Sequence, residues 1–400
     1  MTATAVKERR VVLAALCATQ ITSWGVLYYA FPVLAGDITA ATGWSTPAIT
    51  AALTVSQLVA AVVGIPVGRW IDGHGPRVVM TAGSLLGVPA VVVVATARNL
   101  PWFFAGWVLA GAAMGAVLYP PAFAALTRYH GPDAVRALTI VTLAGGLAST
   151  VFAPLTATLA VGLDWRQTYL VLAGIFAVVT VPAHWFGLRS PWPPRPPVEL
   201  GQVDVHPRHV ARSRSFVLLA AALSLAALAT YAAIINLVPL LEERGTSTQL
   251  AAVALGLGGA GQVVGRIGYA AIVRHTSVLT RTVAILFALA ATTALLGVLT
   301  TAVALVIGAI VAGMARGVFT LVQATAITDR WGRRYYGHLT GLLSAPMTVT
   351  MALAPFTGAA LAGLLGSYAT TFLVLGGIAA VATALSFRTI PKPQQRQNSP

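Results

Sequence analysis

Twelve apolar stretches of membrane-spanning length dominate this chain of 400 residues. The stretches 78–94 and 283–314, for example, contain no charged residue. Only 9% of all residues are charged, against about 25% in soluble domains, so the chain has too little polar surface to enclose a soluble core. Because a helix of about 20 apolar residues crosses the hydrocarbon layer, the sequence predicts an all-α, polytopic membrane protein.

The predicted spans form two groups of six. The first span is longer than the apolar core of a signal peptide and has no convincing cleavage site, so we expect it to be retained. The predicted spans lie at 11–36, 47–68, 78–97, 101–126, 138–162 and 166–187, and at 216–240, 249–272, 282–300, 302–327, 338–365 and 368–387.

A tandem duplication relates the two groups. At an offset of about 202 residues, the stretch 165–175 matches 368–378, and Gly111 recurs as Gly313. Between the copies lies a segment rich in proline and arginine, which disfavours both a regular helix and burial in lipid. The sequence therefore predicts two pseudo-symmetric six-helix bundles joined by a solvated linker, with domains at 1–187, 188–215 and 216–400.

The basic residues predict the orientation in the membrane, because they accumulate in cytoplasmic loops. With the amino terminus inside, twenty Lys and Arg residues fall in cytoplasmic segments and three, Arg98, Arg166 and Arg244, fall outside. We therefore expect a multi-pass protein of the cytoplasmic membrane with both termini and the linker in the cytoplasm. Contact with anionic lipid accounts for the net charge of +15, so no nucleic-acid partner is expected.

A motif between spans 2 and 3 contains Gly68, Asp72, Gly75 and Arg77. Its spacing resembles the signature loop of the major facilitator superfamily, and the twelve-span duplication resembles that family over nearly the whole chain. Gly68 permits close helix approach, and Asp72 can accept hydrogen bonds from a helix amino terminus, which together form a latch on the cytoplasmic side. The alternative is an ordinary tight turn with a solvated carboxylate.

The corresponding segment of the second copy, 270–274, has neither the glycine nor the aspartate, so one latch is expected. Further charged residues follow span 4 and span 10. They are interpreted either as charge clusters on the cytoplasmic side or as plain cytoplasmic anchors. After span 4 the cluster contains the gating candidates Arg128, Asp133 and Arg136, and after span 10 it lies at 329–333.

Two arginines, Arg266 and Arg316, fall within predicted spans, whereas all ten acidic residues fall in loops. An intramembrane arginine costs at least about 2.5–3.5 kcal/mol and normally faces a partner or a water-filled cavity. A transported anion would balance this charge. Arg316 shares one face of its helix with Thr320 and Gln323, near the depth where carriers bind substrate. Alternatively, Arg316 bonds to carbonyl groups of a broken neighbouring helix.

The two copies can be aligned in two registers around Arg266. At an offset of 197 it matches Arg69 at the cytoplasmic rim, whereas at an offset of 202 it matches Gly64 and lies one turn deeper, which we prefer. The run from Gln262 to Arg266 also resembles span 8 of the monocarboxylate transporter and oxalate:formate antiporter group, in which an arginine binds the substrate carboxylate. The sequence departs from the pattern of that group in two ways. Gln262 stands where proton-coupled members have an aspartate, and span 11 has no lysine such as dicarboxylate carriers use.

Polar and aromatic side chains within other spans are candidate substrate ligands, although each alone can also be a packing residue. We select Tyr29, Tyr119, Tyr231, Asn236, Gln262 and Gln323 to accompany the two arginines. His184 and His338 fall at span ends, where we expect them to be solvated.

These features predict a monomeric secondary carrier for a small organic anion, with a carboxylate as the expected charged group. The alternatives are an efflux carrier for amphipathic compounds and a membrane sensor or scaffold without transport activity. No enzymatic activity, metal or cofactor is expected, since the single Cys17 offers no metal cluster and no phosphate-binding Gly-x4-Gly-Lys motif is present.

Overall fold

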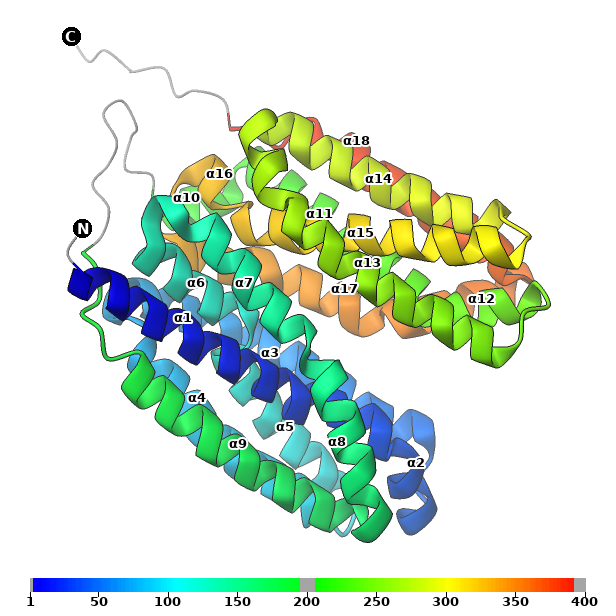
Figure 1. The fold of residues 1–400 in the computed structure, drawn as a ribbon, viewed down its shortest axis with the longest axis horizontal. Helices are drawn as coiled ribbons and strands as arrows, with labels where there is room; N and C mark the ends of the chain where they lie inside the picture. The colour runs from blue at the N-terminus through cyan, green and yellow to red at the C-terminus, as the bar shows by residue number, and fades with distance from the viewer. Residues whose placement is uncertain (1–2, 195–205, 392–400) are drawn as a thin grey trace. The chain divides into compact units, whose positions relative to one another are not determined.

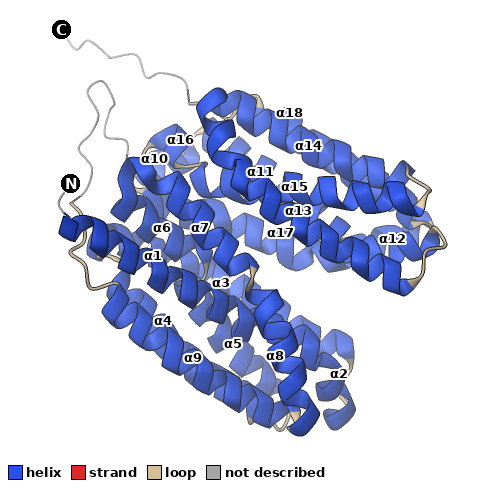
Figure 2. Ribbon diagram, viewed as in Figure 1, coloured by secondary structure: helices blue, strands red, loops and turns tan. Residues whose placement is uncertain are grey.

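The computed structural model describes residues 3–194 and 206–391, and every regular element within them is a helix (Figure 2). Eleven helical runs in this part of the chain are long and apolar enough to cross a membrane. One of them, Leu100–Gly162, has 63 residues, and the 3-10 turn Gly131–Asp133 divides it into two arms that pack together. Each arm is longer than the about 20 residues that one crossing requires, so the run holds two crossings. The predicted all-α membrane fold is confirmed.

The chain forms two compact units. Unit 1 comprises the described parts of Met1–Pro193 and Tyr336–Ala352, and unit 2 those of Pro194–Tyr335 and Leu353–Pro400. In unit 1, α4 (Pro76–Ala95) packs against α5 (Leu100–Val117) and α9 (Trp165–Gly187). In unit 2, α13 (Thr248–His275) packs against α15 (Ala302–Thr325), and α14 (Val278–Val298) packs against α18 (Tyr368–Ser386) (Figure 1).

The helices of unit 1 are α1 (Ala3–Trp24), the π-helix η1 (Gly25–Tyr29), α2 (Ala30–Thr42), α3 (Thr46–His74), α4 (Pro76–Ala95), α5 (Leu100–Val117), α6 (Tyr119–His130), the 3-10 turn η2 (Gly131–Asp133), α7 (Ala134–Gly146), α8 (Ala148–Gly162) and α9 (Trp165–Gly187). Those of unit 2 are α10 (Pro207–Arg212), α11 (Arg214–Ile235), α12 (Leu237–Glu243), α13 (Thr248–His275), α14 (Val278–Val298), α15 (Ala302–Thr325), α16 (Thr328–Trp331) and α18 (Tyr368–Ser386). The helix α17 (Tyr336–Leu365) begins in unit 1 and ends in unit 2.

Helix caps preserve the duplication where the residues themselves have changed. Asp164 begins α9 with a capping box, in which its carboxylate accepts the Gln167 N–H at 2.8 Å. At the equivalent place in the second copy, the Ser367 hydroxyl accepts the Thr370 N–H and begins α18. Both side chains satisfy N–H groups that the first helical turn leaves without partners.

Four spans that were predicted as continuous helices are interrupted, namely spans 1, 4, 5 and 7. Span 5 breaks at Leu147, between α7 and α8. Span 1 contains the π-helix η1, where Gly25 leaves room for the ring of Phe152 from α8. Span 4 breaks at Leu118, just before Pro120 and Pro121, which have no N–H to continue the helix. Because tertiary contacts and single residues cause these breaks, hydropathy did not reveal them.

Span 7 breaks at Asn236, between α11 and α12. The Asn236 amide packs against Gly358 of α17, and a Cβ at position 358 would collide with it. Asn236 is therefore buried at the junction of two half-helices, an arrangement that transporters use near binding sites.

The predicted linker 188–215 is only partly described, because residues 195–205, and the tail after 391, lie outside the described residues. Its second part contains the short helix α10, which begins with Pro207 at its first position, where proline is tolerated. The prediction that this segment excludes regular helix is therefore wrong for 207–212.

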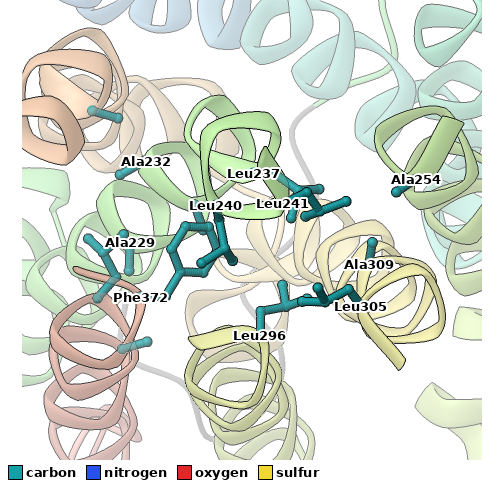
Figure 3. Close-up of a cluster of buried hydrophobic side chains, with 14 of the residues drawn as sticks. Ala229, Ala232, Leu237, Leu240, Leu241, Ala254, Leu296, Leu305, Ala309 and Phe372 are labelled. Carbon is teal, nitrogen blue, oxygen red and sulfur yellow. The ribbon is translucent and has the colours of Figure 1, made fainter. Parts of the chain in front are cut away.

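Part of the unit 2 core is a cluster of buried side chains, mainly of alanine, leucine and phenylalanine (Figure 3). It joins Leu237 and Leu240 of the broken span 7 to Leu296 of α14, Leu305 of α15 and Phe372 of α18. Small residues such as Ala229 and Ala309 let these helices approach closely, which is how helices associate when lipid offers no hydrophobic gain.

Candidate functional site

Glycines line both sides of the crossing between α13 and α15. A Cβ at Gly261 would collide with the Ile310 carbonyl group, and a Cβ at Gly313 would collide with that of Gly258. The backbones are thus in direct contact, as in glycine-lined transmembrane crossings. The glycines that do this are Gly258, Gly261 and Gly265 of α13 and Gly313 and Gly317 of α15.

This crossing brings the two intramembrane arginines close together. Arg266 on α13 is 4% exposed, and Arg316 on α15 is half-buried. Both interact electrostatically with Tyr231 of α11, and Arg316 Nη2 lies 3.5 Å from the Gly258 carbonyl oxygen. Three helices of unit 2 therefore present two guanidinium groups and one phenol to a common region.

The depth of Arg266 agrees with the deeper of its two registers. It lies nine residues before the end of α13 at His275, or about 13 Å along the helix axis. The carbonyl of Met314 abuts Gly265, the residue before Arg266, so Arg266 lies beside the turn of α15 that carries Arg316. The two arginines therefore lie on adjoining turns of α13 and α15.

The other unit 2 candidates divide into two kinds. Gln262 lies one turn before Arg266 on α13 and Gln323 two turns after Arg316 on α15, both half-buried. Asn236 instead donates its side-chain N–H to the Ala232 carbonyl at 2.8 Å. Its side-chain amide therefore satisfies a backbone carbonyl group at the break in span 7. A hydropathy pattern does not indicate this role.

A cavity of about 30 Å³ lies next to Arg316, among α11, α13, α14 and α15. Its polar lining consists of Arg316 and the three threonines Thr230, Thr292 and Thr293. The rest is apolar and includes Leu237, Leu296 and Ala309 of the cluster in Figure 3. Sequence analysis missed these threonines because threonine is common in spans as a packing residue.

In unit 1, Tyr29 and Tyr119 belong to an aromatic cluster around the π-helix. The Trp24 ring lies 5.2 Å from that of Tyr119 and 6.4 Å from that of Tyr29. A pocket of about 80 Å³ lies beside Trp24 and is mostly apolar, with polar side chains from Gln57, Ser344 and Thr348 and thioethers from Met114 and Met351. A π-helix frequently marks a functional site, because it widens the helix locally and redirects side chains.

The signature motif of unit 1 forms the expected latch. Asp72, 7% exposed, accepts the N–H groups of Gly337 and His338 at 2.9 and 2.8 Å through its two carboxylate oxygens. These groups lie in the first turn of α17, so a carboxylate meets the positive end of a helix dipole. Gly68 and Gly337 touch through their backbones. The solvated-turn alternative does not fit this geometry.

The motif differs from the prediction in being mostly helical. We expected a loop after residue 68, but α3 continues to His74 and only Gly75, with φ of +84°, turns the chain. Arg77 donates from Nε to the Trp185 carbonyl at 2.9 Å and stacks over that ring at 4.1 Å. It therefore ties α4 to the end of α9.

Trp192, near the beginning of the predicted linker, packs against unit 1, whereas Arg189, Pro191 and Pro194 are exposed as predicted for a solvated segment. The Trp192 ring lies against Gly75, 5.3 Å from the Arg128 guanidinium carbon and 5.2 Å from the Tyr129 ring. Arg128 in turn donates to the Asp72 carbonyl at 3.1 Å. Arg128 thus joins the latch, whereas Asp133 and Arg136 are exposed near the start of α7.

Both histidines were predicted to be solvated, and both predictions are wrong. His184 is 0% exposed, and its Nδ1 lies 2.8 Å from the Ser84 hydroxyl of α4. His338 is buried in the latch, with Nε2 3.4 Å from Arg69 Nη2. Their helices extend past the hydropathy boundaries and pack against neighbours, which a span prediction cannot show.

The charged cluster after span 10 is a packed network. Arg281 of α14 forms an ion pair with Asp329 of α16 at 2.6 Å. Arg330 donates to the hydroxyl of Thr282 at 2.9 Å and to the Thr389 carbonyl at 3.1 Å. Burial lowers the pKa of Arg330 to about 10. Of the two interpretations given for this cluster, the geometry favours an organised network over plain anchors.

Glu243 caps α18 at the other end of unit 2. It accepts the Ser367 hydroxyl at 2.7 Å and the Tyr368 N–H at 2.5 Å. Burial opposes ionisation of Glu243, but these bonds, with the Ala369 N–H and the charge of Arg244, outweigh it and lower its pKa.

This lowered pKa predicts an acid-sensitive cap. The stabilisation by Glu243 is present above the ordinary carboxyl pKa and is lost as pH falls through the lowered value. We expect Glu243→Gln to melt at a lower temperature than wild type at neutral pH and to lose less of its stability on acidification. Melting temperatures between about pH 7 and pH 3 test this, with Glu242→Gln as the control for removing a neighbouring charge. Parallel pH profiles for wild type and Glu243→Gln would contradict it.

Comparison with known proteins places this fold in a family. The model of the Major Facilitator Superfamily matches residues 16–304 and 279–400. The solved structure of the human organic anion transporter MFSD10 (TETRAN) is similar with a TM-score of 0.74 and 17% identity, over 94% of this chain and 99% of that one. A variant of the Escherichia coli fucose:proton symporter FucP gives 0.72 and 14%, over 94% and 98%.

A second FucP structure, in the outward conformation, gives a TM-score of 0.71 at 16% identity, over 95% of this chain and 99% of that one. No curated protein matches the chain at a significant level. The structural likenesses show the fold, and the family match covers most of the sequence. The chain therefore belongs to the major facilitator superfamily of membrane transporters.

Proposed function

We propose that this transporter is a secondary carrier that moves a small organic anion across the cytoplasmic membrane by alternating access, with a carboxylate as the charged group. The convergence of Arg266, Arg316 and Tyr231 within unit 2 carries this proposal. A guanidinium group binds a carboxylate through two parallel hydrogen bonds, and a phenol adds a donor. MFSD10, which shares the fold, is an organic anion transporter.

The roles of the site residues follow from their positions. Arg316 and Arg266 hold the carboxylate, and Tyr231 orients it. Gln262 and Gln323, on the same two helices, select among anions by hydrogen bonding. The resemblance of 262–266 to the monocarboxylate and oxalate:formate group supports this assignment. Trp24 gives the pocket of unit 1 an aromatic wall suited to apolar groups, and Tyr29 and Tyr119 pack against Trp24.

Asp72 is the gating residue in this proposal. Its bonds to the first turn of α17 hold two helices of unit 1 together in one state of the carrier, and transport requires them to break and re-form. With the excess of basic residues in the predicted cytoplasmic segments, both termini and this latch lie in the cytoplasm. We expect the carrier to work as a monomer.

Export of amphipathic compounds is the second candidate function. The mostly apolar pocket of unit 1, with Trp24, Met114 and Met351 in its lining, favours it, because flexible thioethers adapt to varied apolar ligands. Drug accumulation in cells, with and without the transporter, separates this function from carboxylate transport. A sensor or scaffold would show neither activity.

Exchange kinetics test the proposed carrier. Proteoliposomes loaded with a radiolabelled carboxylate are expected to release it faster into buffer containing the unlabelled compound than into substrate-free buffer. The reason is that a bound anion offsets the charge of two guanidinium groups while the carrier reorients. Faster release into substrate-free buffer would contradict this mechanism, and no release of any carboxylate would contradict the substrate class.

A further inference from the structure

We propose that the first part of the linker, residues 188–193, is a strap that holds the Asp72 latch closed, and that Trp192 is a positioning residue of this latch. The proposal rests on the proposed function in one respect, because the latch is the gating element of that carrier. The strap and the latch both lie within unit 1.

Trp192 reaches the latch through Arg128. The guanidinium carbon of Arg128 lies over the indole ring, 5.3 Å from its centre, and Arg128 Nη2 donates to the Asp72 carbonyl oxygen at 3.1 Å. Arg128 is only 9% exposed, and an aromatic ring attracts a cation more strongly when the cation is removed from water. The ring also lies against Gly75, where the chain turns after α3. Trp192 therefore holds Arg128 in the orientation in which it bonds to the residue that carries the latch carboxylate.

Two further contacts fix the strap to unit 1. The Tyr129 hydroxyl donates to the Ser190 carbonyl at 2.9 Å, and the Tyr129 ring lies 5.2 Å from that of Trp192. Leu188 is 1% exposed. Because Tyr129 follows Arg128 in α6, two successive residues of one helix hold the backbone and the indole ring of the strap.

The sequence makes the strap stiff. Residues 189–194 contain no regular helix, and Pro191, Pro193 and Pro194 have fixed φ angles. Each proline also favours an extended backbone at the residue before it, which includes Ser190 and Trp192. Proline-rich segments act as semi-rigid spacers, so a displacement at one end of the strap reaches the other end.

The strap and the latch adjoin two places where the chain passes from one unit to the other. Unit 2 begins at Pro194, two residues after Trp192. The chain returns to unit 1 at Tyr336, directly before the two N–H groups that Asp72 accepts. A movement of unit 2 therefore pulls on the chain at the strap and at the first turn of α17. Since displacing Trp192 frees Arg128, the linker joins this movement to release of the latch.

Amide hydrogen exchange of the purified full-length protein, measured by mass spectrometry, tests the strap. The N–H groups of Gly337 and His338 lie in the first turn of α17, where a helix offers them no acceptor, so their bonds to Asp72 protect them. Opening of the latch is thus measured as amide exchange at 336–339. We expect Trp192→Ala to raise this rate about fivefold, as loss of a desolvated cation–π contact implies.

Two further substitutions of Trp192 separate its positioning role from loss of packing. Trp192→Leu keeps an apolar side chain but has no π face, so it is expected to behave like Trp192→Ala. Trp192→Phe keeps an aromatic ring over Arg128 and removes only the indole N–H, which has no hydrogen-bond partner. Its amide exchange at 336–339 is expected to stay near that of the wild type.

The matched control is Trp165→Ala. Trp165, at the start of α9, also lies under an arginine, with the Arg166 guanidinium carbon 4.1 Å from its ring centre, and it is 3% exposed. This variant is expected to lower the melting temperature and to leave amide exchange at 336–339 unchanged. A purely structural role of Trp192 would give the same pattern in Trp192→Ala.

A double variant tests the route through Arg128. In an Arg128→Met background, Trp192→Ala is expected to add no further amide exchange, since the cation is already absent. An equal rise in that background overturns the strap, and so does unchanged exchange at 336–339 in both Trp192→Ala and Trp192→Leu. These results leave the proposed function intact if carboxylate exchange is still observed. Conversely, the expected amide exchange in a protein that transports no carboxylate would support the strap and contradict the proposed function.

Discussion

Arg316→Ala is expected to reduce the rate of carboxylate exchange by about two orders of magnitude at subsaturating substrate. Removing one partner of a buried charge pair costs about 2–5 kcal/mol, and each 1.4 kcal/mol is tenfold in affinity. Arg316→Lys keeps the charge but loses the two-pronged hydrogen bonding of the guanidinium, so we expect an intermediate defect. Initial exchange rates in proteoliposomes, normalised to reconstituted protein, measure both effects.

Arg212→Ala is the matched control for loss of a positive charge. Arg212 is exposed at the end of α10, so exchange by this variant should equal that of the wild type. Because Arg266 and Arg316 act on one anion, the double alanine variant should lose less than the combined losses of the single variants. If folded Arg316→Ala protein exchanged carboxylate at the wild-type rate, the assignment of Arg316 to the substrate site would be wrong.

Gly261→Ala is expected to lower the free energy of unfolding by roughly 1–3 kcal/mol, the usual cost of overpacking a close contact. A Cβ at this position meets the Ile310 carbonyl of α15, which is backbone and cannot rotate away. Separating α13 from α15 also moves Arg266 relative to Arg316, so exchange should fall with stability. Melting temperature and exchange rate together measure this.

Gly259→Ala, two residues earlier on the same helix, is the control. A Cβ there meets no atom within 4 Å, and alanine is a better helix former than glycine by about 1 kcal/mol. We expect this variant to match or exceed the stability of the wild type. If Gly261→Ala and Gly259→Ala had equal melting temperatures and equal exchange rates, the crossing of α13 and α15 would tolerate separation of the two helices.

Much of the fold was predictable because the membrane imposes a simple rule on composition. A segment that crosses lipid must be helical and apolar, so hydropathy located the spans to within a few residues. The motif residues Gly68 and Asp72 were identified because their spacing resembles the signature loop of the major facilitator superfamily, and a close helix approach and a helix-dipole contact give that spacing a physical reason. Neither inference required knowledge of which helices are neighbours.

Other features depended on contacts between distant residues. His184 meets Ser84 and His338 meets Arg69, and nothing in the local sequence of either histidine indicates those partners. The packing of Trp192 over Arg128 likewise reverses the expectation that a proline-rich stretch is solvated. Whether such residues are buried depends on which distant segments of the chain pack against them.

The sequence by itself determined the class of the protein: helices that cross a membrane, two related copies, and two arginines in apolar spans. It did so because the cost of placing charge or unpaired backbone in lipid acts on each segment independently. The tertiary structure alone decided that Arg266 and Arg316 share one region with Tyr231, because the crossing of α13 and α15 sets their separation. It also decided that three threonines from two helices line a pocket beside Arg316, since only packing brings α11 and α14 together there.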